Sequence, residues 1–435
     1  MSAIQLARLS RTELKVVSIV TLLLFLGLLG TDIHLSALPE MMRAMHTTRS
    51  MMQSSISVFL FGVGLSALIY GPVSDVYGRK PVVMTGLVIA IAANLIGATL
   101  NDIGPFLTAR FIQGVGSGVC VALSRIVLSD IVQGERYAIT SSYITLFTGL
   151  SIVLGPVIGS FMLTRFGWQA NFIVMASMLT GILAVYACLC PETNVHRNRD
   201  IRIRNVFANY KAVLRNETFV SATLLAGIGM ACFVMYTATS PFVLQQQFGL
   251  SPRLYGWVTA LVSAGLLVSR SLLPRFIRRY GMPMMICLGL VILIACGSLL
   301  LILNGLDVLS TFAFLLSVSG VFFSYTFIVL CASAMSISPF TDKRGAAGAV
   351  YSFSQMALAF AVNSAVSLLS GNAVVLLGAS YIVLPTAGLY LCRAVSNVKR
   401  NTMPSERSYQ VEKQVQAWWR RLRTASGKRV WHVAG

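Results

Sequence analysis

Two ionisable side chains interrupt long apolar stretches of this sequence. Asp32 stands late in the stretch 16–38, and Arg110 stands in the stretch 104–128. A charge inside a bilayer costs roughly 2.5–3.5 kcal/mol on insertion scales, so charged residues retained there usually serve a function. A carboxyl group that faces a partly dry cavity can bind and release a proton as the cavity changes. We therefore predict that Asp32 carries the coupled proton; the alternative is that Asp32 only anchors its helix. Arg110 is expected to hold backbone carbonyls or to tune the pKa of an acid.

Other charged or titratable side chains in these stretches are weaker candidates. His34 follows Asp32 by two residues, about 200° around a helix, so the two do not share a face. Histidine titrates near neutrality, and a proton relay therefore competes with a purely structural role. Arg125, Arg270 and Arg393 stand near the expected cytoplasmic ends of their stretches, where long side chains can extend to the headgroups.

The elements that must position these residues are membrane-spanning helices. Only 11% of the 435 residues are charged and 56% are hydrophobic, whereas soluble domains have about 25% charged residues. A helix needs about 20 apolar residues to cross the hydrocarbon core. The first stretch exceeds a signal-peptide core of roughly 7–15 residues, so we expect it to be retained. We predict an all-α membrane protein with twelve spans: 16–38, 51–73, 82–100, 104–128, 138–163, 169–190, 218–243, 254–274, 282–303, 308–334, 345–369 and 373–395.

Lysine and arginine predict the orientation. Of the 34 such residues, 26 fall in segments on one side, 4 fall in the loops on the other side, and 4 lie within spans. Basic residues gather in cytoplasmic loops, so both termini are expected in the cytoplasm. The net charge of +20 is therefore interpreted as a signal of topology. Nucleic-acid binding is the rival interpretation, but the charge is spread over short loops and not gathered in one domain.

An internal repeat divides the chain into two halves of six spans. Shifting the sequence by 203 positions brings Tyr77-Gly78 onto Tyr280-Gly281 and Gly86-Leu-Val-Ile89 onto Gly289-Leu-Val-Ile292. Both halves begin on the same side, so the repeat is parallel. The predicted parts are a cytoplasmic N-terminus (1–15), two six-helix bundles (16–190 and 218–396), a hydrophilic linker (191–217) and a basic cytoplasmic tail (397–435). In the tail, Trp418 and Trp419 among basic residues suit either an interfacial helix or a disordered segment.

Acidic and basic residues also meet at the expected cytoplasmic ends of spans two to four. Asp75, Arg79 and Asp130 fall there, and an ion-pair network between them would hold the inner gate while the outer side is open. Ordinary topology charges are the alternative. Gly155-Pro156 is expected to kink the fifth span, either to seal the closed side or merely to fit the bundle. Small residues Gly114 to Gly118 in the fourth span would permit close helix approach.

Three segments resemble motifs of the major facilitator superfamily. They are Gly71-Pro-Val-Ser-Asp-Val-Tyr-Gly-Arg-Lys80, Arg110-Phe-Ile-Gln-Gly-Val-Gly116 and Gly155-Pro-Val-Ile-Gly159. The resemblance covers residues 16–396 and implies a major facilitator fold of two six-helix pseudo-repeats. It implies a cytoplasmic gate at Gly71, Asp75, Gly78, Arg79, Lys80 and Asp130, a proton-coupling role for Arg110, and an antiporter motif at Gly155, Pro156 and Gly159. Ser160 departs from the family, which often has a second glycine there.

A narrower resemblance is to the Bcr/CflA-type drug-resistance exporters. It rests on Asp32-Ile-His-Leu-Ser-Ala-Leu-Pro39 and on Ser240-Pro-Phe-Val-Leu-Gln-Gln-Gln-Phe-Gly-Leu-Ser-Pro252, with His34 and Ser36 in place of the usual Tyr and Pro. It implies a monomer in the bacterial inner membrane that exports drugs or other small amphipathic compounds by alternating access. The implied partners are the substrate, protons and membrane lipid, without nucleic acid. No cofactor is implied, since the proton gradient would drive transport.

Several alternatives to drug export stay open on the sequence. The exporter's natural substrate could be a metabolite such as a siderophore. An importer on the same fold is disfavoured by Gly155-Pro156, and a lipid-handling or sensor protein would leave the embedded charges unexplained. No enzyme is predicted, since Gly114-x-Gly-x-Gly118 lacks the Lys-Ser/Thr of a nucleotide loop. No metal site is predicted either, because the Cys188-x-Cys190 spacing does not suit zinc. Candidate cavity residues are His34, Gln113, Tyr143, Phe233, Tyr236, Tyr351, Gln355 and Asn363.

Overall fold

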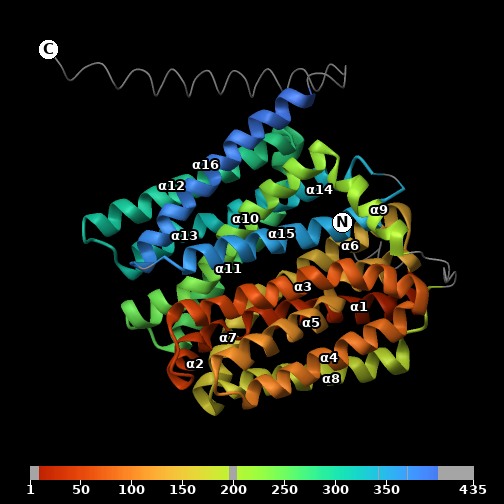
Figure 1. Ribbon diagram of the computed structural model, residues 1–435, viewed down its shortest axis with the longest axis horizontal. Coiled ribbons are helices and arrows are strands. Elements are labelled where there is room, and N and C mark those ends of the chain that lie inside the picture. Colours follow the sequence, from red (N-terminus) through yellow and green to blue (C-terminus); the bar gives the residue numbers. More distant parts are fainter. Residues whose placement is uncertain (1–8, 195–202, 341, 370, 400–435) are drawn as a thin grey trace.

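Membrane-length helices make up most of the structure (Figure 1). The computed structural model describes residues 9–194, 203–340, 342–369 and 371–399. Within these residues, 12 helical segments are long and apolar enough to cross a bilayer, which confirms the predicted number of spans. Large apolar side chains such as Leu261 and Phe312 are 77% and 76% exposed on the outside of the bundle. Lipid tails can cover such surfaces without cost, whereas water cannot.

The first half of the chain contains six spans. They are α1 (Arg11–Asp32) with the short turn η2 (Leu35–Ala37) and α2 (Leu38–Ala44), then α3 (Arg49–Tyr77), α4 (Arg79–Thr99), α5 (Ile103–Ile131), α6 (Gly134–Thr148) with α7 (Leu150–Phe166), and α8 (Gln169–Leu189). These helices form the red-to-yellow part of Figure 1. Most extend a few residues beyond the predicted spans, because helices continue into polar caps after the apolar residues end.

The second half repeats this pattern in the green-to-blue part of Figure 1. It contains α10 (Glu217–Phe242) with the π-helical turn η3 (Val243–Gln247), α11 (Pro252–Tyr280), α12 (Met282–Gly305), α13 (Thr311–Tyr325) with the π-helical turn η4 (Thr326–Leu330) and α14 (Cys331–Ile337), α15 (Arg344–Ser367), and α16 (Ala373–Lys399). We name the two ends of the bundle after the short helices there: the α2 end, and the α9 end with α9 (Ile203–Leu214).

Equivalent positions of the two halves have equivalent backbone conformations. Gly78 ends α3 with φ 101°, and Gly281, 203 positions later, ends α11 with φ 79°. Only glycine adopts such angles readily, so the repeated Tyr-Gly pair marks the same helix termination twice. The first span of each half is also irregular beside a proline. Pro39 forbids a helical hydrogen bond to residue 35, so α1 ends at Asp32, and Pro241 precedes η3.

Hydrogen bonds tie the two halves together at the α2 end. Here α15 packs on α3 and α11 packs on α7. The hydroxyl of Ser50 donates to the carbonyl of Ser367 at 2.7 Å, and the Gln53 amide donates to the carbonyl of Ala238 at 3.1 Å. Farther toward the α9 end, a Cβ atom built at Gly71, Gly345 or Gly348 would have no neighbour within 4 Å. The hydrogen bonds at the α2 end therefore join the two halves there.

Part of the predicted hydrophilic linker forms a helix. Within 191–217 the chain forms α9, whose Tyr210 hydroxyl donates to the carbonyl of Leu68 in α3 at 2.8 Å. Burial raises the pKa of the Tyr210 phenol, and nearby Asp75 raises it further, so the phenol remains a neutral donor. The sequence analysis missed this helix because Tyr210 and the buried Val213 stand among basic and polar residues. Trp418 and Trp419 lie outside the described residues.

Candidate functional site

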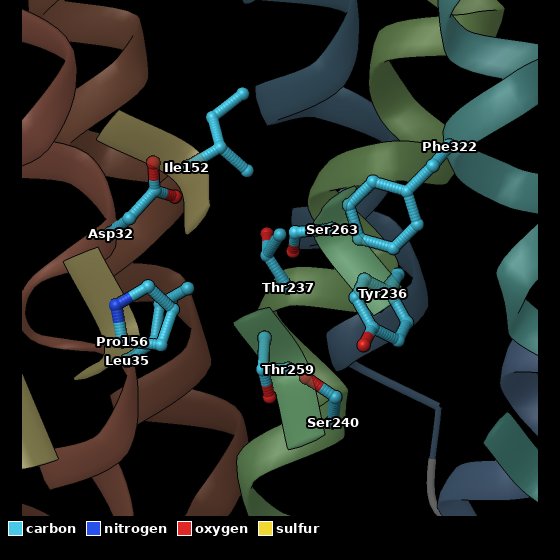
Figure 2. Close-up of a pocket in the computed structure, with 10 residues that line it drawn as sticks. All are labelled: Asp32, Leu35, Ile152, Pro156, Tyr236, Thr237, Ser240, Thr259, Ser263 and Phe322. Carbon is cyan, nitrogen blue, oxygen red and sulfur yellow. The ribbon is translucent and has the colours of Figure 1, made fainter. Parts of the chain in front are cut away.

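Asp32 lies at a cavity between the two halves. Its side chain is only 4% exposed, and the cavity holds about 220 Å³ of space free of protein atoms. Among the described residues, no hydrogen bond or ion pair reaches the Asp32 carboxyl group. Figure 2 shows Asp32 on one wall, facing side chains of α10 and α11 on the other. A carboxylate buried at the C-terminal end of a helix costs free energy until a proton or a cation neutralises it.

Hydroxyl groups line the wall that faces Asp32 (Figure 2). Tyr236 and Ser240 stand one turn apart on α10, and Thr259 and Ser263 stand one turn apart on α11. The hydroxyls of Tyr236, Thr259 and Ser263 are buried without a partner in the described structure. Buried hydroxyls without partners are ready to hydrogen-bond a ligand. Of the eight predicted cavity residues, only Tyr236 lines this cavity. Ser240, Thr259 and Ser263 were not predicted, although the four-residue spacing of Thr259 and Ser263 places both on one face of a helix and could have indicated them.

The Gly155 motif packs directly against Asp32. A Cβ atom at Gly155 would lie 2.7 Å from the Cβ atom of Asp32, and one at Gly159 would collide with the carbonyl oxygen of Ile33. Pro156 lines the same cavity. The two glycines therefore let α7 approach the end of α1 at backbone distance. The structure joins two features that the sequence analysis had treated separately.

Ser160, the departure from the family motif, faces the second half. A Cβ atom at Gly256 of α11 would collide with the hydroxyl oxygen of Ser160 and lie 2.8 Å from the carbonyl oxygen of Pro156. Gly256 thus provides the space that Ser160 occupies. The close approach of α7 and α11 is kept because the glycine lies on the opposite helix.

Arg110 lies apart from Asp32, inside the first half. It is 2% exposed; one guanidinium nitrogen, Nη1, donates to the side chain of Gln113 at 2.7 Å, and the guanidinium carbon lies 4.6 Å from the ring centre of Phe59. Gln113 in turn donates to Asn94 at 2.9 Å. The prediction that Arg110 holds backbone carbonyls or an acid is not met, since a side-chain amide and an aromatic face surround the guanidinium in the described structure. Gln113 belongs to this network and not to the cavity at Asp32.

His34 is buried beside this network. Its ring stacks on Phe172 with 4.0 Å between centroids, and both ring nitrogens lack a partner among the described residues. The helix break after Asp32 turns His34 away from the cavity and toward α8. The expectation that Asp32 and His34 occupy different faces is therefore consistent with their surroundings.

Aromatic rings extend from the hydroxyl wall into the second half. Phe233 stacks near Tyr325 with 4.5 Å between centroids and meets Phe322 edge-on at 5.7 Å. The other predicted cavity residues are distributed around them. Tyr351 donates to the carbonyl of Val329 at 3.2 Å, Gln355 is buried on α15, Asn363 ties α15 to α10 through the carbonyl of Ala231 at 3.4 Å, and Tyr143 is exposed on α6.

The charged residues of the predicted gate meet at the α9 end. Arg79, at the start of α4, donates to Asp75 of α3, to Asp130 of α5 at 3.2 Å and to the hydroxyl of Ser74 at 2.7 Å. The positive φ of Gly78 places Arg79 at this junction. All partners belong to the first half, so the network joins α3, α4 and α5 and does not bridge the halves.

Residues after α8 complete this network, and the sequence analysis missed them. The Glu192 carboxylate accepts from the backbone N–H groups of Arg79 at 2.9 Å and Lys80 at 3.2 Å. These N–H groups begin α4, where the helix dipole favours an anion. Asn194 donates to the backbone carbonyls of Ser74 and Asp75. Glu192 could have been predicted, because it is an acid placed just after the last apolar residues of the first half.

Two six-span halves around a buried polar cavity define a polytopic membrane transporter. Residues 20–364 match the model of the family described as Major Facilitator Superfamily, and the chain belongs to this superfamily of transporters. The resemblance seen in the three motifs is thereby confirmed.

Curated relatives carry names of drug-resistance proteins. The chain is 28% identical over 327 residues to "Multidrug resistance protein MdtL" of Citrobacter koseri, a match that covers 75% of this chain and 82% of the relative. It is 25% identical over 332 residues to the protein of that name in Shewanella oneidensis, with the same coverage.

Solved structures with the same fold include sugar transporters. A crystal structure of a D-xylose-proton symporter gives a TM-score of 0.69 at 16% identity, covering 87% of this chain and 96% of that one. The partially occluded inward-open xylose transporter XylE from E. coli gives 0.70 at 14% identity, covering 92% and 99%. These similarities concern the fold alone.

Proposed function

We propose that the protein exports small amphipathic organic compounds or drugs in exchange for protons, by alternating access across the bacterial inner membrane. The observation that carries the proposal is Asp32, a buried carboxyl group without a partner in the described structure, facing unpaired hydroxyls across the interface between the halves. The names of the MdtL relatives support drug export. Export of a natural metabolite such as a siderophore would use the same chemistry.

Exchange follows from competition at Asp32. A proton or a positively polarised group of the substrate can neutralise the carboxylate, but both cannot do so at once. Protonation from the outer side would release the substrate, and deprotonation toward the cytoplasm would reload the site. The positive-inside distribution of Lys and Arg supports a cytoplasmic α9 end.

Alternating access is supported by the size of the cavity. The centres of water-sized spheres can occupy only about 10 Å³ of it, roughly the room for one water molecule, whereas small-molecule pockets usually have ~300–1,000 Å³. A substrate therefore requires the halves to separate around Asp32. The close contact of Gly256 with Pro156 and Ser160 of the other half lies where such a separation must occur.

The test is proton-driven transport in proteoliposomes by an Asp32→Asn variant. We expect the variant to insert and fold but to lose substrate flux that depends on the proton gradient. Asp307→Asn is the matched control, since Asp307 is an exposed loop acid with φ 55°, a conformation that Asn tolerates. Undiminished gradient-driven flux in Asp32→Asn would refute the proton role, and substrate uptake with the proton would identify a symporter.

A further inference from the structure

Two arginines from opposite halves lie between the Asp32 cavity and the α9 end. Arg125 stands six residues before the end of α5, and Arg270 stands ten residues before the end of α11. At 1.5 Å per residue these positions are roughly 9 and 15 Å inside the helix ends. The prediction that Arg270 extends to the headgroups is wrong. Its Nη1 atom instead donates across the interface to the carbonyl of Thr145 in α6, at 3.0 Å.

Both arginines face the region between the halves. Arg125 belongs to the first half, yet its electrostatic neighbours are Arg270, Tyr325 and Tyr351 of the second half. Arg125 is nevertheless exposed, which requires open space at this level. The Nε atom of Arg270 is buried and lacks a partner in the described structure. Two guanidinium groups, one from each half, therefore lie close enough to interact electrostatically.

No carboxylate neutralises this pair among the residues the structure describes. The ion pairs there are those of Arg79 with Asp75 and Asp130, and of Arg136 with Glu13. Asp32 interacts electrostatically with Tyr325, which lies between the acid and the arginines. Like charges at close range in a low-dielectric region repel each other. The Thr145 carbonyl satisfies one donor of Arg270 but neutralises no charge.

We propose that Arg125 and Arg270 form an anion-binding site on the α9 side of Asp32, and that the transported compounds carry a carboxylate or sulfonate group. The inference rests on the proposed export function and names its substrate class: a zwitterion whose anionic group binds the arginines and whose positive group reaches Asp32. The guanidinium fork suits such oxyanions because it binds them through two parallel hydrogen bonds. The adjoining Tyr325 and Phe233 rings offer a flat surface for the apolar body.

The test measures binding to the detergent-solubilised full-length protein without a proton gradient. The probes are naphthalene sulfonate and naphthyl trimethylammonium, which share an apolar body and differ in the sign of their charge. We expect the wild type to prefer the sulfonate. Arg125→Gln and Arg270→Gln should each weaken sulfonate binding by roughly ten- to hundredfold, the value of a charge-assisted hydrogen bond, and leave the cation unchanged or improved.

Two further variants separate recognition from a structural role. Arg270→Lys keeps the charge and should retain part of the sulfonate preference, whereas Arg278→Gln, an exposed cation farther along α11, should leave it unchanged. Equal weakening of both probes by Arg270→Gln would show that the arginine only joins the halves, and a wild-type preference for the cation would overturn the site. Transport by the wild type that does not depend on the proton gradient, with the sulfonate preference intact, would instead refute only the exchange mechanism.

Discussion

Replacing Gly256 by alanine should shift the balance between conformations. The added Cβ atom would lie 2.8 Å from the carbonyl oxygen of Pro156 and 2.9 Å from the Cβ atom of Ser160, where ordinary contacts begin at 3.4 Å. Helices α7 and α11, which belong to different halves, must therefore move apart by several tenths of an ångström or more. Overpacking of this kind costs about 1–3 kcal/mol, from which up to about 1 kcal/mol is offset by the better helix propensity of alanine.

A net cost of about 1–2 kcal/mol applies only to the conformation in which α7 and α11 are packed together. The ratio between this conformation and one with the helices apart should then change by roughly five- to thirtyfold. Transport should slow, since a cycle needs both conformations. A glycine-to-alanine substitution whose Cβ atom makes no such contact should leave this ratio unchanged, because an equilibrium shifts only when its two states differ in interaction energy.

The assay is labelling of a cysteine introduced at Thr239, which is buried between the halves at the α2 end. A membrane-impermeant maleimide should react faster in Gly256→Ala than in the parent. Gly181→Ala on α8 is the matched control, because a Cβ atom there meets nothing within 4 Å. Unchanged labelling and transport in Gly256→Ala, or an equal effect of Gly181→Ala, would refute the packing explanation.

Three other substitutions test separate parts of the structure. Arg110→Lys should reduce turnover at unchanged expression, since an ammonium cannot both reach Gln113 in the same geometry and lie flat on Phe59; wild-type turnover would make the guanidinium dispensable. Asp75→Asn should slow transport by weakening a partly exposed ion pair with Arg79, 44% exposed on the acid side, by about 1 kcal/mol; unchanged transport rates would leave the network without a role. Gln53→Ala removes a hydrogen bond between the halves at the α2 end, which should favour the conformation open at that end by about 1 kcal/mol, or roughly fivefold in population. Unchanged protection of a cysteine at Thr239 from maleimide labelling would contradict this.

The parts of the molecule that were predicted correctly share a local physical cause. The length of the apolar stretches determines the number of spans, because a helix must cross the hydrocarbon core. The Tyr-Gly pairs at residues 77–78 and 280–281 end their helices because only glycine adopts the required φ. The three charges of the network at Arg79 were foreseen as neighbours because each stands at the same end of a span.

Other features depend on how the helices are rotated and tilted against each other. Most faces of these helices are apolar, so hydropathy does not indicate which face meets which neighbour. For that reason the sequence predicted backbone carbonyls or an acid beside Arg110, and it did not indicate Thr259 and Ser263. It also directed Arg270 to the headgroups instead of across the interface.

The sequence by itself therefore determined the membrane class, the number of spans, the repeat and the embedded charges, since each depends on composition or spacing along one segment. The tertiary structure alone decided what those charges meet. Asp32 comes from the first span, Gly155 from the fifth, and the facing hydroxyls from the seventh and eighth. Contacts between such distant segments arise from the packing of whole helices, in which a glycine on one permits the backbone of another to approach.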